Sequence, residues 1–261
     1  GTPDSILIEA GGAIEAAGDI TLAVNSDALA PNGGPAPVNA RTILNGTVSN
    51  TTGDINISAA QAIELNTDVT STGGTVSFNS PVILTGTSSV SNDGTITFAS
   101  TVDGANDLSV DAGSGTTTFD GALGATTPLG DGTGAALTIA GGAATFNGTV
   151  ATASGIVQEA SAGLVTFNED VTITGGDTAS SFAGNVTLDG LTFQTIDQDA
   201  SFTGSTLTLA GSTGVTLRVG GTSAHTITVD AQVVGPVATA LNIWTNPASA
   251  VILTNADNTY A

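Results

Sequence analysis

The chain has 261 residues, with 23 Asp and Glu against two arginines and no lysine, which gives a formal charge of −21. This charge repels a phosphate backbone and an anionic membrane surface, so the composition argues against nucleic acid and anionic lipid as partners. Cysteine is absent, which excludes disulfides and thiolate metal sites. The 35 glycines and the 40% of apolar residues fit neither an α-helical nor a disordered chain.

A five-residue phrase recurs along the chain: Gly, any residue, a small or apolar residue, Thr/Ser/Asn, and Phe/Leu/Ile. Most of its starts are 20 or 21 residues apart. In chain order they are Gly18, Gly53, Gly74, Gly94, Gly115, Gly142, Gly163 and Gly184. Without the glycine, the same register is predicted to continue at 205–209, 225–229 and 249–253, which makes about eleven units.

A second apolar segment follows several of these phrases, and a third often closes the unit. The second begins after a short polar corner, at Val82, Val102, Leu123, Val150 and Val171. The third closes the unit, as in 62–65, 107–110 and 135–139. Three short strands in 20 or 21 residues are the pattern of one turn of a β-solenoid. The sequence therefore predicts one all-β unit over 1–261, a right-handed parallel β-helix of about eleven coils, with the hand taken from parallel crossovers.

Side-chain alternation predicts which residues face the interior. In 95–98, Ile96 and Phe98 are expected inside and Thr95 and Thr97 outside, because successive strand residues point to opposite faces. Since coils stack about 4.8 Å apart, equivalent inward residues lie above one another. One internal ladder is predicted for Phe78, Phe98, Phe119, Phe146 and Phe167.

Two longer intervals contain turn-rich insertions, near 30–39 and 126–134. Both are rich in Gly and Pro and are predicted to be loops that project from otherwise regular coils. Because binding residues often lie on loops carried by a rigid scaffold, these two loops are the expected contact sites.

The phrases GDITL (18–22), GDINISA (53–59) and GTITFASTVDG (94–104) resemble the β-strand repeats of filamentous-haemagglutinin-like and autotransporter-type bacterial surface proteins. The segment VILTNADNTY (251–260) is similar to the start of another repeat in autotransporter passengers. The resemblance implies a right-handed β-helix, export to the cell surface or medium, and an adhesive or scaffolding role. It implies no catalytic residue.

Calcium is the one metal that the sequence brings into question. Asp103, Asp107 and Asp111 are evenly spaced, and Asp93 and Asp120 lie on adjacent coils, so five carboxylates can supply the oxygen ligands that calcium prefers. The alternative is that they are corner and solvent-face residues, since turns favour Asp. We therefore expect no cofactor, with calcium as the exception to test.

Acidic pairs raise the possibility of glycoside hydrolysis, which needs two carboxylates about 5 to 10 Å apart. Asp197 with Asp199, and Glu169 with Asp170, are such pairs. A chain with 23 acidic residues contains such pairs by chance, so we predict no enzyme and assign no catalytic residue. Lyase chemistry on acidic polysaccharides needs cations, and only Arg41 and Arg218 are present.

The remaining distinctive residues have structural interpretations. His225 is the only histidine, so a Ser-His-Asp triad would depend on it alone, and it stands where other units have their corner glycine. Trp244 and Tyr260 are expected to pack at the end of the rod rather than against a sugar. Outward Thr pairs such as Thr95 with Thr97 suggest an ice-binding array, but other units break the pattern.

The sequence thus predicts a non-enzymatic, extracellular structural or adhesive segment of a longer repeat protein, serving as a rigid stalk, spacer or fibre subunit. The alternative is a glycan-binding or glycan-hydrolysing β-helix. Expected partners are further repeats or other copies through the solenoid ends, and glycans or a cell surface, since exposed strand edges invite pairing. Nucleic acid and direct membrane insertion are not expected.

Overall fold

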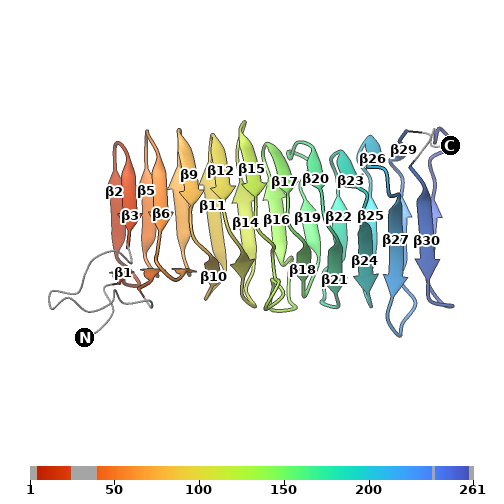
Figure 1. Cartoon of the computed structure of the whole chain (residues 1–261), viewed down its shortest axis with the longest axis horizontal. Coiled ribbons are helices and arrows are strands. Elements are labelled where there is room, and N and C mark those ends of the chain that lie inside the picture. The colour runs from red at the N-terminus through yellow and green to blue at the C-terminus, as the bar shows by residue number, and fades with distance from the viewer. Residues whose placement is uncertain (1–4, 25–39, 237–238, 259–261) are drawn as a thin grey trace.

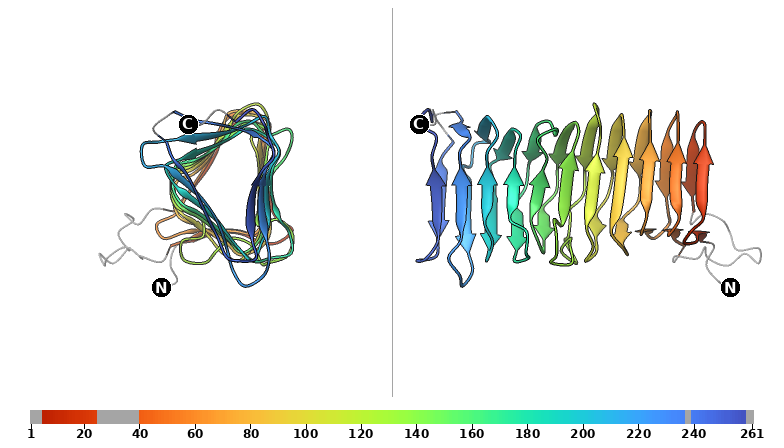
Figure 2. Two further views of the ribbon diagram at one scale, coloured as in Figure 1. Left: turned by 90° about the vertical axis from the view of Figure 1, so that its right-hand side faces the viewer. Right: turned by 180° about the vertical axis from the view of Figure 1, so that it is seen from behind.

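The computed structural model describes residues 5–24, 40–236 and 239–258. Every regular element in these residues is a β-strand, and the strands form a right-handed parallel β-helix. Figure 1 shows the stack of turns from the side, and the left view of Figure 2 shows its triangular cross-section. The predicted fold class is confirmed. No helix in the described residues is long and apolar enough to cross a membrane.

The three faces are called sheets A, B and C here. Sheet B has 11 strands and runs along the whole described stack. Its strands are β2 (Ala13–Ala16), β5 (Thr47–Asn50), β8 (Asp68–Ser71), β11 (Ser88–Asn92), β14 (Leu108–Asp111), β16 (Leu137–Ala140), β19 (Ile156–Gln158), β22 (Ser180–Phe182), β25 (Ala200–Phe202), β28 (Thr226–Val229) and β31 (Ala250–Leu253).

Sheet C has 10 strands and carries most of the repeated phrases. Its strands are β3 (Ile20–Ala23), β6 (Ile55–Ser58), β9 (Thr75–Phe78), β12 (Thr95–Phe98), β15 (Thr116–Phe119), β17 (Ala143–Phe146), β20 (Val165–Phe167), β23 (Val186–Asp189), β26 (Thr206–Ala210) and β29 (Gln232–Val234).

Sheet A is divided into two five-stranded blocks. The first contains β1 (Ile6–Ile8), β4 (Thr42–Leu44), β7 (Ile63–Leu65), β10 (Val82–Leu84) and β13 (Val102–Asp103). The second contains β18 (Val150–Thr152), β21 (Val171–Thr174), β24 (Thr192–Ile196), β27 (Val215–Gly220) and β30 (Leu241–Thr245). Isolated bridges at Leu123, between Val102 and Val150, join the blocks where the 126–134 insertion interrupts the repeat.

The predicted phenylalanine ladder is confirmed. Phe78, Phe98, Phe119, Phe146 and Phe167 are fully buried, and successive rings stack with centroids 4.7, 4.7, 4.8 and 4.8 Å apart. The inward placement of Ile96 and Phe98 is also confirmed, since both have 0% exposure. Beyond Phe167 the column continues with Leu188, and the other phenylalanines enter the core from sheets A and B.

Two register predictions are wrong for the later turns. Residues 225–229 and 249–253 form β28 and β31 in sheet B, whereas sheet C continues through β29. Likewise, 62–65 contains β7 of sheet A rather than a third segment. Alternation marks which residues point inward, but it does not mark the face to which a strand belongs.

The predicted period of 20–21 residues holds in sheet B from β5 to β14, where Val48 pairs with Val69 and Val69 with Val90. It fails near the end, where Ser201 pairs with Thr228. The extra residues lie in the corners and in longer strands, such as the six-residue β27, and the inward strand positions are kept.

The corner between sheets B and C shows why glycine and asparagine recur there. Gly74 has φ 79°, and a Cβ on it would collide with the carbonyl oxygen of Gly53 in the turn below. Buried Asn92 donates from its Nδ2 to the carbonyl oxygens of Gly74 at 3.1 Å and Thr95 at 2.9 Å. An interior amide therefore binds carbonyls of its own turn and of the turn below.

Candidate functional site

Carboxylates connect neighbouring turns at many corners. Asp54 Oδ1 accepts the N–H of Thr75 at 2.8 Å, and Asp199 Oδ1 accepts the N–H of Thr226 at 2.7 Å. The same contact to the next turn is made by Asp19, Asp93, Asp103, Asp170 and Asp197. These seven of the 23 acidic residues therefore connect successive turns, beyond their effect on solubility.

Of the five aspartates considered for calcium, Asp93 and Asp111 lie at one corner between sheets B and C, and the other three lie elsewhere around the turn. Asp93 accepts hydrogen bonds from Ser114, whereas Asp103 accepts from Thr126 and Asp120 accepts from Asn147. Asp111 accepts the N–H of Gly113 in its own turn. Within the described residues, no group of three or more His, Cys, Asp or Glu is arranged to hold a metal ion.

The insertion 126–134 is fastened to the rod. Asp103 Oδ1 accepts the N–H groups of Thr126 at 2.7 Å and Thr127 at 3.3 Å. Leu129 is fully buried and forms a bridge to Thr152 of sheet A. Thr126, Thr127 and Pro128 remain exposed. The other predicted contact loop, 30–39, lies outside the described residues.

Three more carboxylates lie around this insertion. Asp177 Oδ1 accepts the N–H of Gly134 at 2.7 Å. The hydroxyl and N–H of Thr133 lower the pKa of Asp131. Burial and the charges of Asp131 and Asp177 raise the pKa of Asp107, and together they outweigh the backbone N–H of Asp131, which lowers it. Asp107 Oδ1 is buried without a hydrogen-bond partner. Ionising Asp107 therefore opposes the fold, whereas ionising Asp131 favours it.

A groove lies on the outer face of the first block of sheet A. It has a volume of about 320 Å³. Its floor includes Pro81, Ile83 and Thr101. Arg41 and Gln61 form one wall, and Asp103 with Thr126 and Thr127 forms the other. The insertion thus creates one side of the groove.

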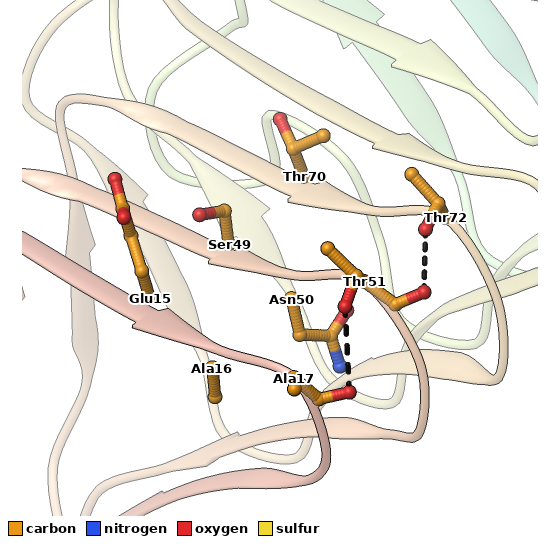
Figure 3. Close-up of a pocket in the computed structure, with 8 residues that line it drawn as sticks. All are labelled: Glu15, Ala16, Ala17, Ser49, Asn50, Thr51, Thr70 and Thr72. Carbon is orange, nitrogen blue, oxygen red and sulfur yellow. Dashed lines mark hydrogen bonds between the residues drawn. The ribbon is translucent and has the colours of Figure 1, made fainter.

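A second, more open trough lies at the edge of sheet B and is drawn in Figure 3. It has a volume of about 490 Å³. Glu15, Ser49 and Thr70 form one outward row across β2, β5 and β8. At its corner the Thr72 hydroxyl donates to the carbonyl of Thr51 at 2.6 Å. The trough offers hydroxyls and a single carboxylate.

The acidic pairs do not share a strand face. Asp197 has φ 53° at the corner after β24, and its carboxylate accepts the N–H groups of Ser223 and Thr222, which lower its pKa. Asp199 lies just before β25 and contacts Thr226. Asp170 accepts the N–H of Thr192 beside exposed Glu169. A lowered pKa is the opposite of what a general acid needs.

His225 lies at a corner with its Nδ1 3.3 Å from Asp199 Oδ1. The nearby Ser249 hydroxyl accepts the backbone N–H of His225 at 3.1 Å, and no serine hydroxyl contacts the His225 ring in the described part of the chain. The pair therefore lacks the nucleophile contact of a triad.

The two arginines have partners in the structure. Arg41 pairs with Glu64 and donates to Gln61 at 2.8 Å. Arg218 lies over the Trp244 ring at 4.2 Å and donates to Gln194 at 3.3 Å. Trp244 is thus a half-exposed side chain on the outer face of β30, and Tyr260 lies outside the described residues.

Outward threonines form one unbroken column on sheet C. It comprises Thr97, Thr118, Thr145, Thr166, Thr187 and Thr208. The neighbouring outward column is broken, because Thr116 is followed by Ala143 and then by exposed Leu164 in the next strand positions. The two-column regularity of an ice-binding array is missing, as the sequence predicts.

Sequence reasoning missed the groove and the carboxylate contacts between turns. The contacts have a recognisable signal, which is an Asp at a corner one turn before a Thr or Ser. The groove has none, because its walls come from segments far apart in the chain. No family model matches the chain, and no curated protein and no solved structure matches it significantly.

Proposed function

We propose that the chain is a non-enzymatic, extracellular β-solenoid segment that serves as a rigid stalk, spacer or fibre subunit of a surface or secreted protein. The observation that carries the proposal is the continuous stack, in which sheet B alone joins 11 parallel strands in register. Bending such a rod requires strand pairing and core contacts to break together. The repeat phrases that resemble filamentous-haemagglutinin-like and autotransporter repeats support a place outside a bacterial cell.

The exposed last strands of the rod favour a partner that supplies further turns of the β-helix. Ile243 of β30 is 51% exposed, although it pairs with Leu217, which is fully buried in the same inward column. In the described residues β29, β30 and β31 each pair on one side only. A further β-helical turn, from the same chain or from another copy, covers these side chains and extends the three sheets.

The charge of the rod sets the conditions for contact between copies. Each chain carries −21, so copies repel one another at low salt and approach more readily when salt screens the charge. An adhesive role of the rod rests on contact surfaces along its three sheets. The insertion 126–134 and the groove beside it are the best formed of these surfaces.

Electron microscopy of the purified chain at low and high salt, with calcium and with chelator, tests this proposal. Single stiff rods of roughly 50 Å are expected from the strand spacing, and end-to-end filaments at high salt would identify a fibre subunit. Flexible or irregular particles in all conditions would contradict a stalk.

A deletion gives a sharper test of the spacer role. Because Thr75 pairs with Thr95, removing residues 75–94 takes out one whole turn. The shortened chain should fold and be shorter by about 4.8 Å. Release of products from neutral polysaccharides by the intact chain, lost on Asp199→Asn, would instead favour a hydrolase.

A further inference from the structure

The groove on sheet A is a prearranged site rather than a gap between loose loops. On one wall, Arg41 is fixed by its ion pair with Glu64 and its hydrogen bond to Gln61. On the other, Asp103 fixes the backbone of Thr126 and Thr127. The floor lies on β10 and the start of β13, which are paired strands of the solenoid, and this leaves little conformational entropy to lose when a ligand binds.

The lining combines an apolar floor with polar walls. Ile83 is the outward residue of β10, and Pro81 precedes that strand in the neighbouring outward position. The walls offer donors in Arg41 and Gln61, an acceptor in Asp103 and a hydroxyl in Thr126, and the floor adds the hydroxyl of Thr101. Small-molecule sites have this composition, an apolar surface with a few convergent polar groups, and volumes from about 300 Å³ upward.

The charges select the class of ligand. Arg41 is already neutralised by Glu64, so it presents hydrogen-bond donors without a net positive charge to attract an anion. The chain charge of −21 and the carboxylate of Asp103 repel sulfated or uronic-acid polymers. A lipid needs a deeper apolar cavity than a floor built from Pro81 and Ile83.

We propose that this groove binds a neutral oligosaccharide, whose apolar ring face lies on Pro81 and Ile83 and whose hydroxyls bond Gln61 and Asp103. The inference deepens the adhesive part of the proposed function by naming a site and a ligand class. It does not depend on whether the rod is a stalk or a fibre subunit, because both leave the outer face of sheet A available.

The first test is binding of the full chain to an array of neutral glycans, which includes hexamers of glucose, xylose, mannose and N-acetylglucosamine. The glycan that binds best is then titrated into the chain, and the backbone amide signals are followed by NMR. Saturable shifts should centre on the amides of Ile83, Thr101 and Thr127. Ile83→Thr should weaken binding about three- to tenfold, because it removes apolar contact area without changing the strand.

The matched control is Val157→Thr, which makes the same kind of change at a half-buried outward position of β19 on sheet B. It should leave affinity unchanged. Arg41→Gln, which changes a wall of the groove, should also weaken glycan binding. Absence of binding to every neutral glycan, equal affinity for Ile83→Thr and Val157→Thr, or shifts centred elsewhere would overturn the proposal. Rod length measured on the same samples separates that failure from a failure of the stalk itself.

Discussion

The middle turns and the later turns fill the same triangular interior in different ways. From β9 to β20, one phenylalanine per turn stacks on the next with rings nearly parallel. After β20, Phe182 stacks on Phe202 at 4.8 Å from sheet B, Phe193 packs edge-on against these two rings at 5.7 and 5.2 Å, and the turns lengthen. The fold therefore requires inward apolar volume on three faces rather than one repeated residue, and the ladder adds a strict register to the middle turns.

The largest expected effect comes from breaking the ladder at its centre. Phe119→Ala should destabilise the chain by about 3–5 kcal/mol, because it leaves a cavity between two stacked rings. Thr118→Ala, the outward neighbour on the same strand, is the matched control and should cost less than about 1 kcal/mol. Urea unfolding followed by circular dichroism measures both. Equal losses of unfolding free energy in the two variants would mean that the stacked rings do not stabilise the fold.

A milder substitution sharpens the contrast between the regions. Phe167→Leu should cost less than Phe119→Leu, because Phe119 stacks on a ring in both neighbouring turns, whereas Phe167 stacks on one ring and has only edge contacts with its other aromatic neighbours. We expect about 1–2 kcal/mol for Phe119→Leu and roughly half of that for Phe167→Leu. The same unfolding assay ranks them, and a reversed order would show that the ladder has no privileged centre.

The corners of the middle turns are the next point to test. Gly74→Ala should cost about 1–3 kcal/mol, because the backbone has φ 79° and the new Cβ meets the Gly53 carbonyl. Gly73→Ala is the control, since nothing lies within 4 Å of a Cβ there. Thermal unfolding of both variants should separate them clearly. Similar melting temperatures would contradict the close approach of successive corners.

Two carboxylates outside the regular turns are expected to change the stability of the chain with pH in opposite directions. The N–H groups of Ser223 and Thr222 lower the pKa of Asp197 below its ordinary 3.8. Its stabilisation is therefore complete above the pKa of the unfolded chain and is lost as pH falls through the folded value. Asp197→Asn, which tolerates the left-handed backbone, should be less stable than the native chain at pH 7, and the difference should shrink below about pH 4.

Asp107 should behave in the opposite sense. Its pKa is raised by burial and by Asp131 and Asp177, so its ionised form opposes folding above the raised pKa and the penalty disappears as pH falls. Asp107→Asn should therefore raise the melting temperature at pH 7 and have little effect in acid. A loss of stability at pH 7 would mean that the Asp107 carboxylate has a favourable partner.

Much of the fold follows from local signals in the sequence. Alternation placed Phe98 and Ile96 inside, the glycine phrase located the strands of sheet C as far as β23, and the same register without glycine located β26. It failed at 225–229, because a strand with correct alternation fits sheet B as well as sheet C. The groove could not be predicted from the sequence, because Arg41, Ile83 and Thr126 come together only when the insertion packs on the rod.

Distances between spin labels test the central claim, a rigid rod in fixed register, most directly. The native chain has no cysteine, so paired cysteines can be placed without other changes. Asn56 and Thr208 lie in one outward column of sheet C, seven strand spacings or about 34 Å apart, and Thr97 and Thr208 lie five spacings or about 24 Å apart. Double electron–electron resonance should give two narrow distributions whose separation matches two turns. Broad distributions, or distances that do not scale with the number of turns, would contradict the rod.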